Sequence, residues 1–539
     1  MQCTIRLWLS LLSTLVSASL LPAADWPMWR HDPGRSAATE EDLPDQLALR
    51  WTVEMPRPVA AWPNEPRLQF DPSYEPIIVG DLLLVGSMID GSVRGLDLST
   101  GRQRWHFSSE GPVRLAPAAS KDRIYFGSDD GYLYCLRADD GRLLWKVRGA
   151  PEDRPDRRHL GNNRLVSFWP VRGGPVVVDG AVYCAAGIWP TMGVFVLAVD
   201  AQSGRVIWRN DKLGLIEHVR LDHNDLRESG LSPQGHLAVQ GDTLLVPNGR
   251  SMPAGLDIRT GELRYYVQGY RNGDCRVVAA DKYALVGQAG AVHRDTGREV
   301  GSRWADAGRD APNAFDAAKF HLFEGPIHPY QFMPGCSARS AISGSVAFGL
   351  EQGVFYAYDL AGAAVSEYES KQADRTLKPW RWDAPELWRL ATDEAAKKPA
   401  GSALAKAGGR LYGHTGSRLV AVDIPADPAD RPKPAWSQPL NATVTTMLAA
   451  NGHLVVVTGD GKILAYGAGP AADASVVPSP NTGPVDVVEP WKQAAANILD
   501  CTKITEGYCA VLGIGSGQLL RALLEQSKLR LVGVDSNAT

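Results

Sequence analysis

Cysteine is scarce in this chain, and neither sign of charge dominates. Seven cysteines in 539 residues are too few and too scattered for a disulfide framework, and neither a CxxCH haem site nor an adjacent pair of cysteines occurs. Lysine and arginine number 56 against 60 acidic residues, which leaves a net charge of -4. A general nucleic-acid surface needs a positive stripe. We therefore predict no nucleic-acid partner, and no histidine spacing predicts a metal site.

An apolar run of signal-peptide length occurs only at the start of the chain. MQCTIRLWLSLLSTLVSASLLPAA has Arg6, then an apolar stretch, then small residues suitable for cleavage near Ala24. The alternative is a single membrane anchor, but the run is short and interrupted by Ser and Thr. We predict a signal peptide at residues 1–24, a periplasmic or secreted protein, and no membrane span after cleavage.

Eight tight turns, each between two short apolar runs, recur along the rest of the chain. Their residue types mostly tolerate the positive φ of primed hairpin turns. The eight are Gly80-Asp81, Lys121-Asp122, Asp179-Gly180, Gly241-Asp242, Asp281-Lys282, Ser343-Gly344, Gly408-Gly409 and Asn451-Gly452. A period of roughly 40 residues with four strands per unit is typical of propeller blades.

A second signature follows the early hairpins. In GLDLSTGRQRW, Asp97 precedes Gly101 by four residues and Trp105 follows it by four. The same spacing recurs in Asp200, Gly204 and Trp208, and with a tyrosine in Asp257, Gly261 and Tyr265, whereas later copies decay. Glycine lets the chain turn from the third strand into the fourth, and the aromatic ring can fill the wedge between neighbouring sheets.

The two ends of the repeat region complement each other. The eighth unit, GHLVVVTGDGKILAYGAG, has only three strands, whereas the segment LALRWTVEM around Trp51 is a strand with no hairpin of its own. We predict that this strand completes the last blade and closes the ring, which removes open sheet edges. The predicted fold is an all-β, eight-bladed β-propeller over residues 25–469.

The motif DWPMWR and the blade endings TGRQRW, DGRLLW and SGRVIW resemble the pyrroloquinoline quinone (PQQ) type of propeller repeat. The resemblance implies the fold but leaves function open, because such propellers serve both as quinoprotein dehydrogenases and as cofactor-free scaffolds, such as those that assist outer-membrane protein assembly. The dehydrogenases pair the quinone with Ca²⁺ held by acidic and amide side chains. We find no such set in this sequence.

Four insertions, at 148–174, 209–235, 305–339 and 366–402, are expected to join the fourth strand of one blade to the first strand of the next and so to share one face. Two candidate ligand-binding pairs accompany this face. They are Trp169 with Arg172, and Asn248 with Arg250, which would offer an aromatic plate and guanidinium forks to a planar or anionic ligand. The alternative is that arginine caps loop carbonyls and tryptophan packs the wedge.

The last of these insertions holds the segment KPWRWDAPELWRL. Its alternation of tryptophans and charged residues predicts a short amphipathic helix or a partner-docking face, with core packing as the favoured role.

Residues after 469 change character. A Pro, Ala and Ser stretch at 470–488 predicts a linker, and residues 489–539 predict a helix followed by a β-α-β unit. Its glycine pattern GxGxG with an acidic residue after the second strand resembles the first two motifs of the S-adenosylmethionine (SAM) dependent methyltransferase fold. The resemblance implies cofactor contacts from Gly513, Gly515, Gly517 and Asp535. We expect an incomplete Rossmann-like domain; a chance glycine cluster is the alternative.

The sequence thus predicts an exported propeller that binds a small molecule or a protein on its loop-rich face. Two alternatives stay open: an oxidoreductase that uses PQQ and calcium, and a fragment of a SAM-dependent methyltransferase fusion. No catalytic residue is identified.

Overall fold

The fold was analysed in a computed structural model. The structure describes residues 25–65, 70–161, 164–220, 226–249, 251–266, 274–287, 290–297, 333–367, 370–372, 375–377, 380–392, 403–469, 475–478 and 486–535. The predicted signal peptide, 1–24, lies outside these residues. Within the described part of the chain, neither helix has the length and apolar character needed to cross a membrane.

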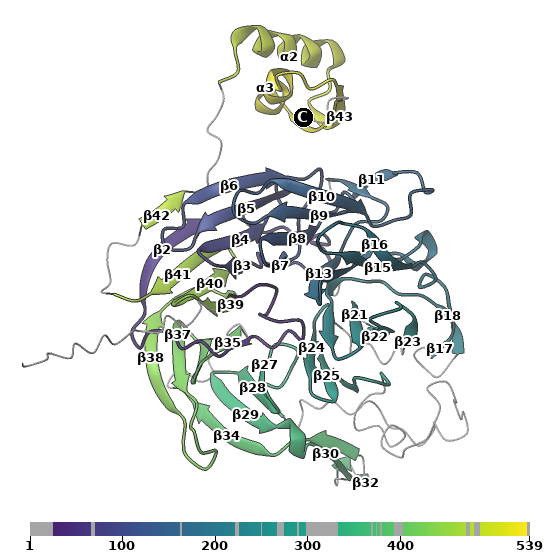
Figure 1. Cartoon of the computed structure of the whole chain (residues 1–539). Helices are drawn as coiled ribbons and strands as arrows, with labels where there is room; N and C mark the ends of the chain where they lie inside the picture. Colours follow the sequence, from purple (N-terminus) through teal and green to yellow (C-terminus); the bar gives the residue numbers. More distant parts are fainter. Residues whose placement is uncertain are drawn as a thin grey trace, which may run out of the picture.

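Eight antiparallel sheets are arranged in a ring (Figure 1), which confirms the eight-bladed propeller. The innermost strand has three or four residues in six of the blades, and the two strands next to it are largely buried where the structure describes their side chains. The first four blades consist of β3 (Ile77–Val79), β4 (Leu82–Gly86), β5 (Ser92–Asp97) and β6 (Gln103–Ser108); β7 (Ala118–Ser120), β8 (Arg123–Gly127), β9 (Tyr132–Arg137) and β10 (Leu143–Arg148); β13 (Gly173–Val178), β14 (Ala181–Ala186), β15 (Phe195–Asp200) and β16 (Val206–Asn210); and β20 (Ala238–Gln240), β21 (Thr243–Asn248), β22 (Ser251–Asp257) and β23 (Leu263–Tyr265).

The remaining blades follow the same order, with three strands described in the fifth. They consist of β24 (Val277–Ala280), β25 (Tyr283–Val286) and β26 (Gly290–His293); β27 (Ala341–Ser343), β28 (Val346–Glu351), β29 (Val354–Asp359) and β34 (Glu386–Ala391); β35 (Leu404–Ala407), β36 (Arg410–Thr415), β37 (Arg418–Asp423) and β38 (Lys433–Pro439); and β39 (Val444–Ala450), β40 (His453–Thr458) and β41 (Lys462–Gly467), joined by β2 (Ala48–Glu54).

The strand around Trp51 closes the ring as predicted. β2 pairs antiparallel with β41, with Trp51 opposite Ala465, and so supplies the fourth strand of the eighth blade. A further strand, β42 (Ser475–Pro478), pairs parallel with the outer side of β2. Part of the segment expected to be a linker is therefore a strand of this blade, although the boundaries of the linker and domains stay a prediction.

Tight turns join the first two strands of the blades. Lys121, Asp179, Asp281 and Asn451 have φ between 49° and 56°, as the primed turns require of these non-glycine residues. In the sixth blade β27 ends at Ser343 and β28 begins at Val346, so the turn is Gly344-Ser345, one residue later than predicted.

An aromatic ring from the outer strand of one blade lies against a glycine of the next. A Cβ placed on Gly101 would lie 2.8 Å from the ring of Trp51, and one on Gly204 would lie 2.8 Å from the ring of Trp145. The indole N–H of Trp51 also donates to the carbonyl oxygen of Leu98 at 2.8 Å. The predicted wedge packing is confirmed. The aromatic rings also lie against glycines of their own blades, as Trp105 does against Gly95.

Residues 25–43, which we call the axial segment, run through the middle of the ring (Figure 1). Inner strands of five blades donate backbone hydrogen bonds to carbonyl oxygens of this segment; the donors are Ala119, Val239, Ala279, Ile342 and Lys406. At its centre the buried guanidinium of Arg35 donates to the carbonyl oxygens of Leu237 at 2.7 Å and Pro175 at 3.0 Å. The segment therefore ties the blades together across the axis.

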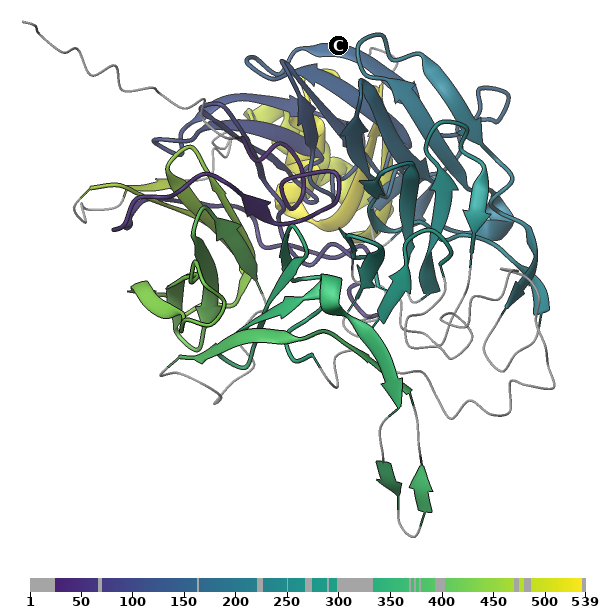
Figure 2. The same cartoon turned by 60° about the horizontal axis from the view of Figure 1, so that its bottom comes forward.

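The structure of the insertion at 366–402 differs from two of our expectations. The segment KPWRWDAPELWRL forms β33 (Trp380–Asp383) and β34 rather than a helix, and β34 is the outer strand of the sixth blade. Most of the insertion therefore joins the third strand of that blade to its fourth and leaves from the face opposite to the one predicted. It contains β30 (Ala364–Glu367), β31 (Ser370–Gln372) and β32 (Arg375–Leu377), which extend away from the ring with β33 (Figure 2).

Two of the other insertions hold short hairpins. These are β11 (Arg158–Gly161) with β12 (Arg164–Ser167), and β17 (Ile216–Arg220) with β18 (Leu226–Ser229). The two-residue strands β1 (Ala38–Thr39) and β19 (Gly235–His236) pair parallel with the inner strands β35 and β13.

Residues 486–535 form a small α/β unit, as predicted. It consists of α2 (Glu489–Thr502), β43 (Glu506–Leu512), α3 (Gln518–Gln526) and β44 (Lys528–Val534). β43 and β44 pair in parallel, and α3 forms the crossover between them. Ala495, Ala522 and Leu523 form its core.

A pair of glycines in the third blade tests the wedge packing. Gly204 and Gly180 have nearly equal φ, 76° and 78°, but only Gly204 lies against a tryptophan. We expect Gly180→Ala to destabilise the protein by about 1–2 kcal/mol through backbone strain. Gly204→Ala is expected to cost about 1–3 kcal/mol more, because its methyl group overpacks the Trp145 contact. Urea unfolding measures both, and equal losses would contradict an energetic role for the wedge.

Candidate functional site

A cavity of about 230 Å³ lies beside the axial segment. Its lining comes from the axial segment, from the chain before β3, and from the approaches to the inner strands of four more blades. The residues that matter for its chemistry are Trp29, Arg30, Glu75, Arg276, Arg339 and Thr446. We call this space the axial cavity.

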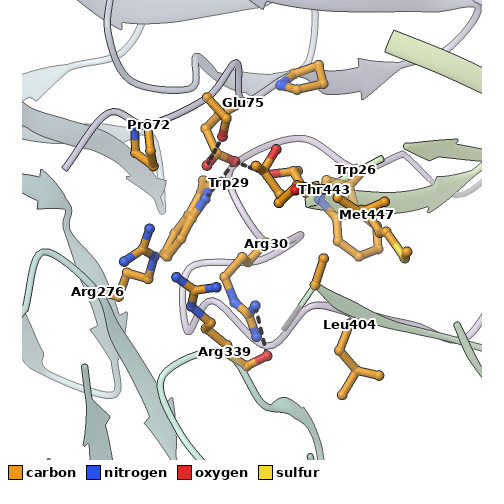
Figure 3. A pocket seen from close by; sticks show the side chains of 16 residues that line it. Trp26, Trp29, Arg30, Pro72, Glu75, Arg276, Arg339, Leu404, Thr443 and Met447 are labelled. Atoms are coloured by element: carbon orange, nitrogen blue, oxygen red, sulfur yellow. Dashed lines mark hydrogen bonds between the residues drawn. The ribbon is translucent and has the colours of Figure 1, made fainter. Parts of the chain in front are cut away.

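The charged residues of the axial cavity occupy related positions in different blades. Glu75 lies two residues before β3, Arg276 immediately before β24, and Arg339 two residues before β27. Since inner strands surround the axis, residues that precede them converge there. Figure 3 shows the guanidinium groups of Arg30, Arg276 and Arg339 gathered together, with Glu75 at the opposite end of the Trp29 indole.

Backbone carbonyls hold Arg30 in the cavity. Its guanidinium donates to the carbonyl oxygens of Arg35 at 3.0 Å and Arg339 at 3.2 Å, and also to that of Ser340. The backbone of Arg30 has φ 55°, in the left-handed region that non-glycine residues rarely adopt. The axial segment thus accepts local strain in order to place this side chain.

Burial and like charge shape the electrostatics of the cavity. Burial raises the pKa of Glu75, whose carboxylate accepts from Trp29 Nε1 at 3.0 Å and Thr446 Oγ1 at 2.9 Å. Burial, together with the nearby guanidinium of Arg276, lowers the pKa of Arg30 to about 9 and that of Arg339 to about 10. All three arginines stay cationic at neutral pH.

A second arginine cluster forms ion pairs with buried carboxylates. Arg114 donates to Asp129 at 2.6 Å and to Asp71 at 2.7 Å, while Arg172 donates to both oxygens of Asp129 at 2.8 and 2.9 Å. The four side chains are buried. Although burial opposes it, the guanidiniums of Arg172 and Arg114 lower the pKa of Asp129 to about 2.

Three of the four residues predicted to bind a ligand make other contacts in the structure. Trp169 is buried and donates its indole N–H to Met192 at 2.8 Å, Arg172 belongs to the paired cluster, and Asn248 accepts from the Ser232 backbone at 2.6 Å. None of these three lines the axial cavity. Arg250 lies outside the described residues. A ligand role for these four stays a prediction.

The residues that do line the cavity escaped the sequence analysis. Arg30 belongs to the DWPMWR motif, which indicated only the type of repeat. Glu75, Arg276 and Arg339 lie one or two residues before an inner strand, the same position that drew attention to Arg172. A comparison of this position across all eight blades would have found them.

The described residues do not fit a calcium-quinone centre. Ca²⁺ takes six to eight oxygen ligands, usually with several carboxylates. Glu75 is the only carboxylate in the lining of the cavity, and three guanidiniums beside it repel a cation. Over the described part of the chain, no three His, Cys, Asp or Glu side chains are grouped so as to hold a metal ion.

The glycine loop of the C-terminal unit does meet the predicted acidic residue. Gly513, Gly515 and Gly517 all have positive φ between β43 and α3. The carboxylate of Asp535 accepts from the backbone N–H groups of Ile514 at 2.7 Å and Gly515 at 3.4 Å. The motif thus forms a local structure, while its use for a cofactor stays a prediction.

Comparisons with known proteins concern the propeller. A family described as outer membrane protein assembly factor BamB matches residues 89–324. The solved structure of a quinohemoprotein alcohol dehydrogenase from Pseudomonas putida covers 88% of this chain and 85% of its own, with a TM-score of 0.50 and 15% identity. Residues 89–324 are therefore similar to this family, and the fold resembles that of the solved structure.

Curated relatives of this chain match only short stretches of it. The dehydrogenase subunit of alcohol dehydrogenase (quinone) from Gluconobacter oxydans is 30% identical over 130 residues, 22% of this chain and 16% of that protein. Outer membrane protein assembly factor BamB from Yersinia pestis is 24% identical over 139 residues, 25% of this chain and 32% of that protein. None of these comparisons supports the methyltransferase resemblance.

The paired cluster predicts a pH dependence of stability. We expect Asp129→Asn to lower the free energy of unfolding by about 3–5 kcal/mol at neutral pH, because it leaves the buried guanidinium of Arg172 without a carboxylate and Arg114 with Asp71 alone. The carboxylate stabilises the fold fully above its unfolded pKa of about 3.9, and this contribution is lost as the pH falls toward about 2. The difference between wild type and variant should therefore shrink over that window in chemical denaturation.

Asp139→Asn is the matched control, since that carboxylate is exposed. Its effect should stay within about 0.5 kcal/mol at every pH. An Asp129→Asn loss that is small, or that does not change with pH, would contradict the role of the cluster.

Proposed function

We propose that this protein is an exported PQQ-like propeller that acts as a binding or scaffold module, with a small-molecule site in its axial cavity. The observation that carries the proposal is the cavity itself: six separate parts of the chain converge on it. The axial segment, held by five blades, forms part of its wall. Ligand sites concentrate where a rigid scaffold gathers polar groups from several elements in this way.

Export rests on the predicted signal peptide and agrees with the relatives. The family that matches residues 89–324 is named as an outer membrane protein assembly factor. In the scaffold form of this proposal, a protein partner binds the loop-rich face. The match to these proteins is distant, so no particular partner follows from it.

A quinone and calcium dependent oxidoreductase is the second candidate, favoured by relatives named as alcohol dehydrogenases. The lining of the axial cavity argues against it, because calcium takes six to eight oxygen ligands and Glu75 is the only carboxylate there. Calcium-dependent uptake of PQQ, with reduction of a dye by an alcohol, would establish this activity in place of the binding role.

A methyltransferase fragment is the third candidate, and it rests on the contact between Asp535 and the glycine loop. If residues 486–535 bind SAM, calorimetry on the full chain detects it, and Asp535→Ala abolishes the heat. No heat from the wild-type chain would remove this candidate.

The primary proposal predicts that the protein carries a partner when isolated from its native compartment. We expect native mass spectrometry to show added mass, either a small molecule released on denaturation or an associated protein. A protein that is free of both, under mild purification from its own host, would contradict the binding role.

A further inference from the structure

The two-stranded sheet of the C-terminal unit is covered by helices on one face. α2 packs on α3, and α3 packs on β44. Leu529 is buried on this face, and Val511 and Leu531 pack against the core that the helices form there. Successive side chains of a strand point to opposite faces, so these three residues mark the covered one. Parallel sheets are normally covered on both faces.

The opposite face of this sheet, which we call the open face, is exposed. Its side chains form four rows across the paired strands: Glu506 opposite Lys528, Tyr508 opposite Arg530, Ala510 opposite Val532, and Leu512 opposite Val534. Leu512 is 80% exposed, more than any other large apolar side chain in the described residues, and Val534 is 49% exposed. The described part of the chain therefore leaves the apolar end of this face uncovered.

The pattern of charge along the open face limits what can cover it. One end has both signs side by side, in Glu506 and Lys528, whereas the other end is apolar. Between them the guanidinium of Arg530 lies 5.5 Å from the ring of Tyr508 and donates to its hydroxyl at 3.1 Å. A complementary surface has both signs at one end and apolar side chains at the other, and the open face itself has this pattern.

A two-fold axis parallel to the strands makes the open face complementary to itself. The axis lies between two stacked sheets and places β43 of one copy over β44 of the other, with both strands running in the same direction. Each residue then meets a copy of its own row partner, so Glu506 lies over Lys528 and Leu512 over Val534 of the second copy. An axis perpendicular to the strands would instead place the charged end on the apolar end, and burying charge in this way is costly.

We propose that two copies of this protein associate through the open faces of their C-terminal units to form a symmetric dimer. Burial of Leu512 and Val534 from both copies supplies the driving force. The charged row at the edge of the contact fixes the relative direction of the strands. Both faces of each parallel sheet are then covered. The inference goes beyond the proposed function and does not rest on the axial cavity.

Sedimentation equilibrium of the purified full chain tests the dimer. We expect the mass of two chains at high protein concentration and of one chain at low concentration. Leu512→Glu should raise the dissociation constant by about a hundredfold or more, because it buries an unpaired carboxylate against Val534 of the second copy, twice in each dimer. Since Leu512 is exposed within one chain, the variant should fold, and thermal unfolding of the monomer verifies this.

Leu524→Glu is the matched control. Leu524 belongs to the same unit and is 55% exposed, but it lies on α3, on the covered side of the sheet. The same substitution at this position should leave the dissociation constant unchanged.

Charge reversal tests the direction of the axis. Glu506→Lys and Lys528→Glu should each weaken the dimer by about two- to tenfold, because each places like charges together at two exposed contacts. The double variant, with both reversals, should regain the wild-type dissociation constant. Only an axis parallel to the strands brings these two residues of different copies together.

Three results would overturn the inference. The first is a wild-type chain that stays monomeric at every concentration, and the second is a dimer that Leu512→Glu does not weaken. The third is a different protein that copurifies with the wild type but not with Leu512→Glu, which would give the open face another occupant. Failure of the double charge reversal to restore the dimer would overturn its two-fold arrangement. All of these outcomes leave the ligand site in the axial cavity untouched.

Discussion

The closed ring of blades depends on one repeated interaction, the contact between an aromatic side chain and a glycine of the next blade. Trp105 lies against Gly141, Trp208 against Gly261, and Tyr265 against Gly297. Because the ring occupies the space of a Cβ, only glycine fits, and the same glycines have positive φ. The indole N–H of Trp105 adds a hydrogen bond to the carbonyl oxygen of Ala138, at 2.9 Å, in the next blade. Each blade is thereby oriented by its neighbour.

Closure uses this same contact. Trp51 reaches the first blade from the last one, because β2 completes the eighth sheet with a strand from the start of the propeller. The axial segment precedes β2 in the chain and is hydrogen-bonded to five inner strands. The beginning of the propeller therefore both closes the ring and occupies its axis. A ring fixed in these two ways holds the approaches to its inner strands at constant positions.

Charge at those approaches falls into two groups. The cluster around Asp129 is held by short ion pairs, and Arg114 also donates to the carbonyl oxygen of Val59 at 3.3 Å. The guanidiniums of the axial cavity are positioned by carbonyls and by the strained turn at Arg30. Arg276 also meets the carboxylate of Asp274 at 3.3 Å, so this group contains an ion pair as well.

Local sequence determined the blades of this protein and the turns that join their first strands. It also determined the wedge residues and the closure by the strand around Trp51. All of these features depend on short-range spacing and backbone preference. It also determined the β-α-β unit around Gly513. The outer strand of the sixth blade was misassigned, since its segment alternates tryptophans with charged residues; Trp382 and Trp388 are buried in strands. Only the tertiary structure decided the site. Arg30, Glu75, Arg276 and Arg339 are up to about 300 residues apart, and Arg172 has the same place before an inner strand as Arg276 and Arg339. Which of these side chains line a cavity depends on the contacts that ring closure creates.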